Sequence, residues 1–531
     1  MTRRDIDTSD IQAIVKAGFE SLTAASYMLL RVGEPHPARQ WLRSLAPTRL
    51  ADLSSNGAKK RVGEAYQVAF TASGLLALGV DRNIVERFSP EFVEGMAGAE
   101  NRSQRLGDIG ENAPPKWDWG FGDKEPHILL ILLAKDAKAL AALVEEKLEQ
   151  ALGAGLSKID ILATSDMHGL EPFGFADGGS QPSFDWDRPH TPGTKADRDY
   201  TNLLALGELL LGYRNEYGLL TERPLLAADE KNAAVLHRDR HAPDRGDLGL
   251  NGSYLVFRQL DQHVLSFWRW VAREAARVGV TMEELAESMV GRRLDGTPLA
   301  DLTLGRPIRG VEASDADING FLYDTDPDGL SCPLGAHIRR ANPRTGDTPG
   351  GQQGQLDHLV GMLGLTVRRD PGATSSTRPW PRNTTVWPFV RSEDDVVASA
   401  RFHRILRRGR EYGEKIDRSV AVDPATQAGA AGLHFICLNA NIARQFEFVQ
   451  SAWIASAKFA ALTGEQDPLL GNREPFPTTP FADPQRTDGF SRPGALPNCR
   501  HSTGLPQFVT VRGGAYFFLP SLTALKWIAS D

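Results

Sequence analysis

Apolar runs of strand length alternate with stretches of helical periodicity in the first third of the chain. Residues 127–134 read HILLILLA, an unbroken apolar run of buried-strand length. Residues 136–152 place apolar positions at helical spacing with charged residues between them, which predicts an amphipathic helix. Residues 65–80 predict a strand that becomes a helix at Thr71 or Ser73, since both residue types favour helix N-termini.

Three neighbouring segments complete the N-terminal pattern. Residues 11–32 hold two apolar runs separated by a polar connection, which predicts strand, connection and strand. Residues 37–45 predict a short helix. Residues 95–122 are rich in Gly, Pro and Trp and have no periodicity, so we expect an ordered surface loop with Trp117 and Trp119 packed against the protein.

The second half repeats the alternation of strands and helices, although it contains no residue-level repeat. Strands are predicted at residues 252–260 and 434–439, and helices at residues 264–278 and 442–459. The predicted strands are too close in sequence for full crossover connections. This spacing favours an α+β fold with antiparallel sheets and helices on one face.

The length of 531 residues predicts two domains, because single hydrophobic cores stop growing near ~250–300 residues. We place the N-terminal domain at residues 1–235 and the C-terminal domain at residues 236–531. Two long irregular segments, residues 174–199 and 341–392, hold much of the Gly and Pro. We expect them to run over the surface, where functional residues are often placed.

Composition excludes several classes of protein. The formal net charge of −7 argues against a nucleic-acid binder, which needs a basic face. There is no apolar run of ~18 residues, so no membrane partner is expected. Three scattered cysteines, Cys332, Cys437 and Cys499, do not form a disulfide framework or a CxxC metal site. With an N-terminus that lacks the apolar core of a signal peptide, these features predict a cytoplasmic protein.

The most informative stretch is SCPLGAHIRRANPR, residues 331–344. It places His337 in a small apolar segment and follows it with a cationic run. A neutral imidazole in such surroundings can be an axial ligand of haem iron, and Arg339, Arg340 and Arg344 are close enough in sequence to meet the haem propionates. A buried histidine without a ligand is the structural alternative.

Two distant segments add candidate chemistry. EPFGFADGGSQP, residues 171–182, is a glycine-rich loop with the carboxylate of Asp177, which could equally be a turn residue. FHRILRRGREYG, residues 402–413, carries the tandem Arg407 and Arg408. The alternative for these arginines is a surface cluster, which is the interpretation we favour for Arg404, Arg408 and Arg410.

In this order, the three segments resemble the dye-decolorising peroxidase family of haem enzymes. Its GxxDG motif is matched by residues 174–178, and the resemblance extends to residues 252–268 and 433–450. It therefore covers most of the chain and is nearest to the larger members without a leader peptide. The resemblance implies two ferredoxin-like domains with antiparallel sheets and peripheral helices, and one haem b held between sheets and helices.

The resemblance also implies a role for each residue on the iron-binding side. His337 would ligate the iron, and Arg344 would bind a propionate. The second ring nitrogen of the histidine needs an acceptor that fixes its orientation. Family resemblance points to Asp467, and Asn441 is the alternative acceptor.

On the peroxide side, Asp177 would be the proton carrier of the reaction. Arg407 would be the fixed cation, since a guanidinium stays charged at any working pH. Arg408 is its nearest competitor. Leu433 and Phe435 resemble the apolar residues that line this side, although alternation on one strand is equally consistent with plain core.

The match to the family is imperfect in three places. Pro172 stands where many relatives have a histidine, and Gly179 replaces a common β-branched residue. Leu334 and Gly335 differ from the frequent Phe-Ala pair. None of these changes removes a functional group, but each could alter the width of the pocket or the surroundings of the haem edge.

The resulting hypothesis is a haem peroxidase. It would reduce hydrogen peroxide and oxidise phenolic, anthraquinone-type dye or other aromatic donors through a ferryl intermediate. The first alternative is a haem-binding or haem-handling protein with little turnover, which would not need both Asp177 and Arg407. The second is a two-domain interaction protein without haem. The natural donor and the oligomeric state are left open by the sequence.

Overall fold

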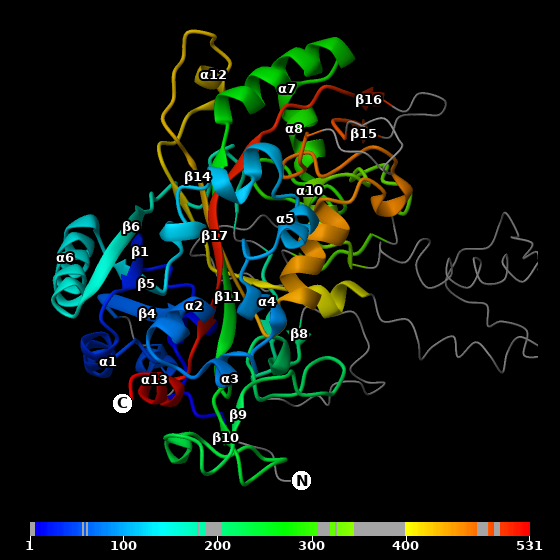
Figure 1. The fold of residues 1–531 in the computed structure, drawn as a ribbon. Helices are drawn as coiled ribbons and strands as arrows, with labels where there is room; N and C mark the ends of the chain where they lie inside the picture. Colours follow the sequence, from blue (N-terminus) through cyan, green and yellow to red (C-terminus); the bar gives the residue numbers. More distant parts are fainter. Residues whose placement is uncertain are drawn as a thin grey trace, which may run out of the picture.

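The computed structural model contains one large antiparallel sheet with helices packed on it (Figure 1). It describes residues 6–55, 58–59, 62–177, 180–186, 203–304, 319–323, 326–344, 399–474, 487–492 and 500–530. Gly178, Gly179 and Cys499 lie outside these ranges, as do most residues of the two irregular segments for which the sequence predicts surface loops.

The large sheet has nine strands in the order β12-β14-β11-β17-β4-β5-β1-β6, with β13 also paired to β14. Its strands are β1 (Ala24–Val32), β4 (Glu64–Phe70), β5 (Ile128–Ala134), β6 (Leu156–Ala163), β11 (Ser253–Gln262), β12 (Leu406–Arg407), β13 (Arg410–Tyr412), β14 (Gly432–Asn439) and β17 (Val509–Leu519). All of the pairings in this sheet are antiparallel. The α+β class with antiparallel sheets, predicted from the sequence, is confirmed.

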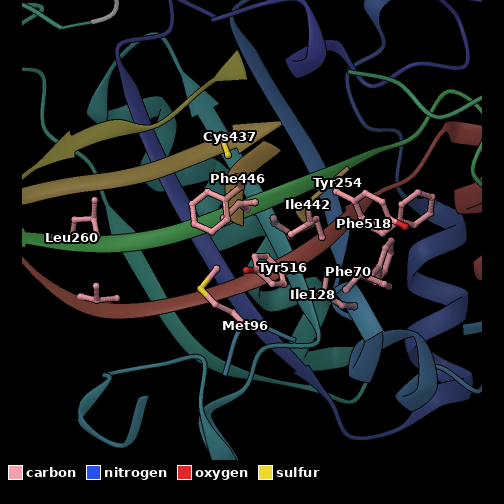
Figure 2. Packing of buried hydrophobic residues seen from close by; sticks show 14 of the residues in the cluster. Phe70, Met96, Ile128, Tyr254, Leu260, Cys437, Ile442, Phe446, Tyr516 and Phe518 are labelled. Atoms are coloured by element: carbon pink, nitrogen blue, oxygen red, sulfur yellow. The ribbon is translucent and has the colours of Figure 1, made fainter. Parts of the chain in front are cut away.

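The sheet has an N-terminal half and a C-terminal half that meet at one residue pair. β1, β4, β5 and β6 form one half, and β11 to β14 with β17 form the other. The two halves join where Phe518 of β17 pairs with Phe70 of β4. Figure 2 shows Phe70, Phe518 and Ile128 gathered at this junction. A division at residues 235 and 236 stays a prediction.

Two hydrophobic cores lie on opposite faces of the sheet, because side chains alternate along each strand. On β5, Ile128, Leu130 and Leu132 join the first core, whereas Leu129 and Ile131 join the second. This arrangement explains why β5 is an unbroken apolar run, since it is buried on both faces.

The helices contribute to the first core. They are α1 (Pro35–Ser44), α2 (Ala72–Ala77), α3 (Arg82–Val85), α4 (Pro90–Glu94), α5 (Glu100–Leu106), α6 (Ala137–Gly153), α7 (Val264–Val278), α8 (Met282–Val290), α10 (His337–Ala341), α12 (Arg418–Ala421) and α13 (Leu522–Ile528). Figure 1 shows α6 beside β1, β5 and β6, and α7 at the end of β11. The prediction that helices cover one face of the sheet is therefore confirmed for the face on which the first core lies.

Local sequence signals explain where several helices begin. Thr71 caps α2 by accepting the N–H of Gly74 at 2.9 Å, as one of the two predicted caps. Asp136 caps α6 in the same way through the N–H of Ala139. The helix predicted at residues 37–45 is α1, which begins at a proline in its first turn.

Three sequence predictions were wrong in detail. Residues 11–32 contain one strand, β1, because the first apolar run forms a 3-10 turn, Ala13–Val15. Residues 95–122 contain α5, although Trp117 and Trp119 are buried as expected. The helix predicted at residues 442–459 is a π-helix in two parts, Ala443–Glu447 and Val449–Ile454.

The remaining strands form short pairs outside the large sheet. These are β2 (Ser54–Ser55) with β3 (Ala58–Lys59), β7 (Ser183–Phe184) with β8 (Leu203–Leu204), β9 (Leu225–Leu226) with β10 (Gly246–Asp247), and β15 (Phe490–Arg492) with β16 (Arg500–Ser502). In the described part of the chain, no helix has both the length and the apolar character needed to cross a membrane.

Candidate active site

A cavity of about 300 Å³ opens between the C-terminal half of the sheet and the helices that cover it. This volume is at the lower end of the ~300–1,000 Å³ typical of small-molecule sites. Leu260 of β11 and Leu433 of β14 are direct neighbours in the register, and both line the cavity with Phe435. The sheet therefore gives the cavity an apolar floor, with Leu433 and Phe435 in it.

His337 enters the cavity from the helix side, as the first residue of α10. Its Nδ1 lies 2.9 Å from Oδ2 of Asp467, whose side chain has no exposed surface. The carboxylate accepts the Nδ1–H, which fixes the orientation of the ring. Within the described residues, Nε2 makes no hydrogen bond. Nε2 is therefore available to a ligand in the cavity.

Asp467 is itself fixed by the backbone. Its Oδ1 accepts the N–H groups of Leu469 and Leu470 at 2.9 and 2.8 Å. Burial would raise the pKa of this carboxyl, but His337 and the backbone donors hold it below its usual value. A charged acceptor thus faces His337. The alternative, Asn441, instead accepts the N–H of Arg444 with its side chain.

Asp177 and Arg407 form an ion pair that lines the same cavity. Arg407 Nη1 donates to Asp177 Oδ1 at 3.0 Å, and about a third of each side chain is exposed. The pair joins two segments that are 230 residues apart in sequence. It leaves a carboxylate and a guanidinium together at the cavity, open enough to exchange protons with water.

Strand alternation explains why Arg407 rather than Arg408 reaches the cavity. Arg407 pairs with Cys437 of β14, and the next side chain points to the opposite face of the sheet. Arg408 there donates from Nε to the carbonyl of Ile14, and burial lowers its pKa to about 10. Arg408 is a structural residue that binds the N-terminal 3-10 turn.

The expectation of a surface cluster at Arg404, Arg408 and Arg410 was wrong. Arg404 is buried and lines the cavity. Arg410 donates to the carbonyl of Leu22 at 2.6 Å, so it packs against the N-terminal segment as Arg408 does. A cationic run in the sequence here marks buried contacts rather than a solvated face.

The loop that presents Asp177 has a defined shape. Asp177 donates its N–H to the carbonyl of Gly169, and Leu170 and Ala176 form a bridge. Gly174 has a φ of +98°, a conformation that a side chain would strain. The carboxylate of Glu171 accepts the N–H of Phe175 across this turn at 2.9 Å. The first glycine of the GxxDG motif is therefore required by the turn before the aspartate.

Two buried arginines lie at another part of the cavity wall. Arg344 Nη1 donates to the carbonyls of Asn319 and Phe321, and its guanidinium lies 3.9 Å from the centre of the Phe321 ring. Burial, with a smaller contribution from the charge of Arg344, lowers the pKa of Arg292 to about 10. Two cations held this close favour an anionic ligand beside them.

Arg339 and Arg340 point away from the cavity, contrary to the expectation that they could meet a propionate. Arg339 donates to Asp326 and to the carbonyl of Cys332. Arg340 donates to four backbone carbonyls at 2.7 to 3.3 Å, which include that of Trp453. Both side chains hold the segment around His337 in place, and only Arg344 of this run lines the cavity.

The cavity also contains residues for which sequence reasoning proposed no role. These are Arg292, Arg404, His403, Glu171, Gln262 and the buried pair of Asp108 with Arg258. The carboxyl of Glu171 could have been suspected, because it stands six residues before Asp177 in the same motif. The others have no signal in the sequence, since they become neighbours only through the sheet register.

Comparison with known proteins shows which family this chain resembles. The family model described as the DyP dimeric alpha+beta barrel domain matches residues 42–165. The multifunctional dye peroxidase DyP2 of an Amycolatopsis species is 28% identical over 527 residues, which span 94% of this chain and 91% of that protein. Over nearly its whole length the chain is similar to dye-decolorising peroxidases, so the predicted resemblance to this family is confirmed. The predicted class of enzyme, a haem-dependent peroxidase, is confirmed with it.

Other dye-decolorising peroxidases are similar to this chain in sequence or in structure over nearly its whole length. The dye-decolorising peroxidase AauDyP1 of Auricularia auricula-judae is 25% identical over 98% of this chain and 86% of its own length. The crystal structure of a peroxidase from that fungus aligns with a TM-score of 0.68 at 23% identity, covering 99% of this chain and 100% of that one. An Anabaena peroxidase aligns with a TM-score of 0.66 over 98% of this chain and 94% of its own.

The residues around the cavity fit the haem of this family. A planar apolar macrocycle suits the floor formed by Leu260, Leu433 and Phe435. His337 has a free ring nitrogen beside this floor, and Arg344 and Arg292 supply the positive charge that carboxylate groups require. The wall therefore offers an apolar surface, a nitrogen ligand and a positive charge, which match the ring, the iron and the carboxylate groups of haem.

Proposed function

We propose that the protein reduces hydrogen peroxide and oxidises phenolic, anthraquinone-type dye or other aromatic donors, with one haem b per chain. The observation that carries the proposal is the composition of a single cavity. An aspartate–arginine ion pair lines it from one side, and a histidine tied to a buried carboxylate lines it from the other. A protein that only carries haem needs the histidine, whereas it has no use for both charged groups.

His337 would bind the haem iron through Nε2, and Asp467 would orient it. Arg344, with Arg292 beside it, would bind the propionates. When bound, haem supplies the redox chemistry by which peroxide is reduced and a donor is oxidised. The protein contributes the ligand, the apolar slot of Leu433 and Phe435, and the charges at its edges.

Asp177 would transfer a proton of peroxide, and Arg407 would stabilise the negative charge that develops on it. Heterolysis of the O–O bond requires one proton to move from the inner to the outer oxygen of peroxide. We assign this transfer to the carboxylate of Asp177, which can take the proton and return it. The guanidinium of Arg407 would stabilise the negative charge on the departing oxygen, because it cannot lose its own proton. The 3.0 Å contact keeps the two groups in mutual reach.

The donor is proposed by analogy with relatives. One solved family structure, with a TM-score of 0.66 and 21% identity, is a complex with 2,6-dimethoxyphenol. A cytoplasmic location remains a prediction from the three scattered cysteines.

Absorption and turnover measurements on the purified protein test the proposal. We expect a Soret band, and peroxide-dependent oxidation of 2,6-dimethoxyphenol and of an anthraquinone dye. A Soret band without turnover of either donor would favour the haem-handling alternative. A protein that remains colourless after reconstitution with haem would overturn the assignment of His337.

A further inference from the structure

A second carboxyl group lies in the wall of the cavity, on the same loop as Asp177. The carboxylate of Glu171 accepts the N–H groups of Phe175 and Phe173 at 2.9 and 3.1 Å. Its Oε2 also accepts Nε2 of Gln262 at 2.6 Å. All three donors are neutral, and among the residues that the structure describes no cation contacts this carboxylate to compensate its charge. An anion in this position is costly unless it can take up a proton.

Gln262 offers a place for that proton. Its side chain is 6% exposed on β11, and among the described residues its Oε1 has no hydrogen-bond partner. If Glu171 took a proton and the amide turned over, the new O–H would donate to Oε1 at the same contact. The pair therefore has two arrangements of similar shape, one with a charged and one with a neutral carboxyl.

The electrostatic surroundings favour such an exchange near neutral pH. Burial, with a smaller contribution from the charge of Asp177, raises the pKa of Glu171 to about 7 against the hydrogen bonds of Phe175, Gln262 and Phe173. The charged or titratable groups that line the cavity with Glu171 are Asp177 with Arg407, Asp108 with Arg258 of β11, Arg292, Arg344, Arg404, His337 and His403. Glu287 of α8 accepts the N–H of Leu294, whose carbonyl accepts the N–H of Ala176 in the same loop.

We propose that Glu171 and Gln262 form a protonation switch, in which Glu171 is a positioning residue for Asp177. Above the transition, the charged carboxylate of Glu171 acts on Asp177 and disfavours a second negative charge in the cavity. Below the transition, Glu171 carries one proton taken from solvent, and the side-chain amide of Gln262 is turned over to accept it. Of the two carboxyl groups Glu171 and Asp177, only Asp177 is then free to ionise. The effect on peroxide chemistry rests on the proposed function, whereas the switch itself does not.

Infrared titration of the purified holoprotein tests the switch directly. We expect the carbonyl band of a buried, protonated carboxyl group to grow as the pH falls through about 7. Glu171→Gln should remove this band, since glutamine keeps an oxygen for the backbone N–H groups but cannot titrate. Glu287→Gln is the matched control, because Glu287 also accepts a backbone N–H and has a raised pKa, but does not line the cavity. It should keep the band.

Gln262→Leu gives a second and independent result. Removal of the amide takes one hydrogen bond from each arrangement, and the bond to the charged carboxylate is the stronger of the two, so the infrared transition should move to higher pH. An unchanged transition in Gln262→Leu, or a wild-type band in Glu171→Gln, would overturn the proposal.

The rate of reaction with peroxide separates the switch from the proposed function. We expect the wild-type rate constant to fall, by about tenfold at most, as the pH rises through about 7, because the charged carboxylate of Glu171 then disfavours the negative charge of Asp177. The rate constant of Glu171→Gln should not change over the same pH range. A flat wild-type profile together with the infrared transition would overturn the positioning role. A wild-type protein that never reacts with peroxide, but shows the infrared transition, would refute the proposed function and leave the switch standing.

Discussion

On the helix side of the cavity, His337 is tied to a carboxylate with no exposed surface, whereas on the sheet side Asp177 and Arg407 each leave about a third of their side chain exposed. Asp467 is further held by two backbone N–H groups. Arg407 has a fixed backbone in β12, but its side chain meets a residue on a loop. His337 itself is 25% exposed, so the two sides differ in the buried contacts that hold the helix side, whereas the ion pair of the sheet side has both members within reach of water.

This difference supports the proposed division, in which one side holds the cofactor and the other handles the substrate. An iron ligand needs one fixed orientation, which a buried and multiply bonded carboxylate provides. A proton carrier needs access to water and a neighbour that keeps its charge, which an exposed ion pair provides. Changes on the helix side should therefore affect haem content, and changes on the sheet side should affect the rate at full haem content.

The largest effect is expected for His337→Ala. Loss of the iron ligand should reduce haem affinity by more than ~100-fold, because loss of an outer partner alone typically costs 10–100-fold. The measurement is haem content per chain after purification and reconstitution. His403→Ala is the control, since His403 lines the same cavity but is stacked on Phe448. Equal haem content in both variants would count against a special role for His337.

Arg407→Leu should slow the reaction with peroxide while haem stays bound. Removal of one electrostatic group at a reacting centre typically costs ~10²- to 10³-fold in rate. Stopped-flow mixing at several peroxide concentrations gives the rate constant. Arg407→Lys keeps the charge and should recover part of the loss. A wild-type rate in Arg407→Leu would remove this residue from the mechanism.

Asp467→Asn should keep the hydrogen bond to His337 and lose the negative charge behind it. We expect haem affinity to fall by ~10- to 100-fold and the reduction potential of the bound haem to rise, because the histidine donates less electron density. Haem transfer assays and a redox titration measure the two effects. Asn441→Ala, which removes only a helix cap, should change neither. A shift in Asn441→Ala instead would reverse the assignment of the acceptor.

Asp177→Asn should cost less than Arg407→Leu. A water beside Arg407 can take over part of the proton transfer, so we expect a loss at the lower end of the ~10²- to 10⁴-fold typical of general acid–base catalysis. The rate constant for peroxide at several pH values checks this. Asp166→Asn, a change just before the same loop but outside the cavity lining, is the control. A larger loss than in Arg407→Leu would show that no water substitutes.

The smallest effect concerns stability. The pKa of Glu171 is raised to about 7 in the folded state, so its contribution to stability is complete below its unfolded value and is lost as the pH rises through 7. The Glu171→Gln variant does not titrate at this position, so it loses no stability here as the pH rises. The difference in Tm between variant and wild type should therefore grow in favour of the variant from about pH 5 to pH 8. A constant difference would argue that Glu171 keeps its proton state.

Much of the fold could be predicted from the sequence, because local patterns decide strands such as β5 and capped helices such as α2 and α6. The failures have physical causes. Residues 11–32 contain two apolar runs, but only the second finds strand partners, on β5 and β6. The glycine-rich strand β17 gives a weak local signal, yet it joins the two halves of the sheet.

The site divides in the same way. His337, Asp177 and Arg407 stand in recognisable motifs, and the structure brings them to one cavity. Arg292, Gln262 and the pair of Asp108 with Arg258 could not be predicted, since their proximity depends on register and on packing between distant segments. Arg339 and Arg340 show the converse, because proximity in sequence to His337 does not bring them to the cavity.

We infer that one side of the cavity holds haem and that the other reacts with peroxide. Stopped-flow absorption of the purified holoprotein, mixed with one equivalent of hydrogen peroxide, tests this division. We expect the Soret band to shift within the mixing experiment and to return when 2,6-dimethoxyphenol is added. A Soret band that stays unchanged would refute the division, and would leave Asp177 and Arg407 as an ion pair without a catalytic role.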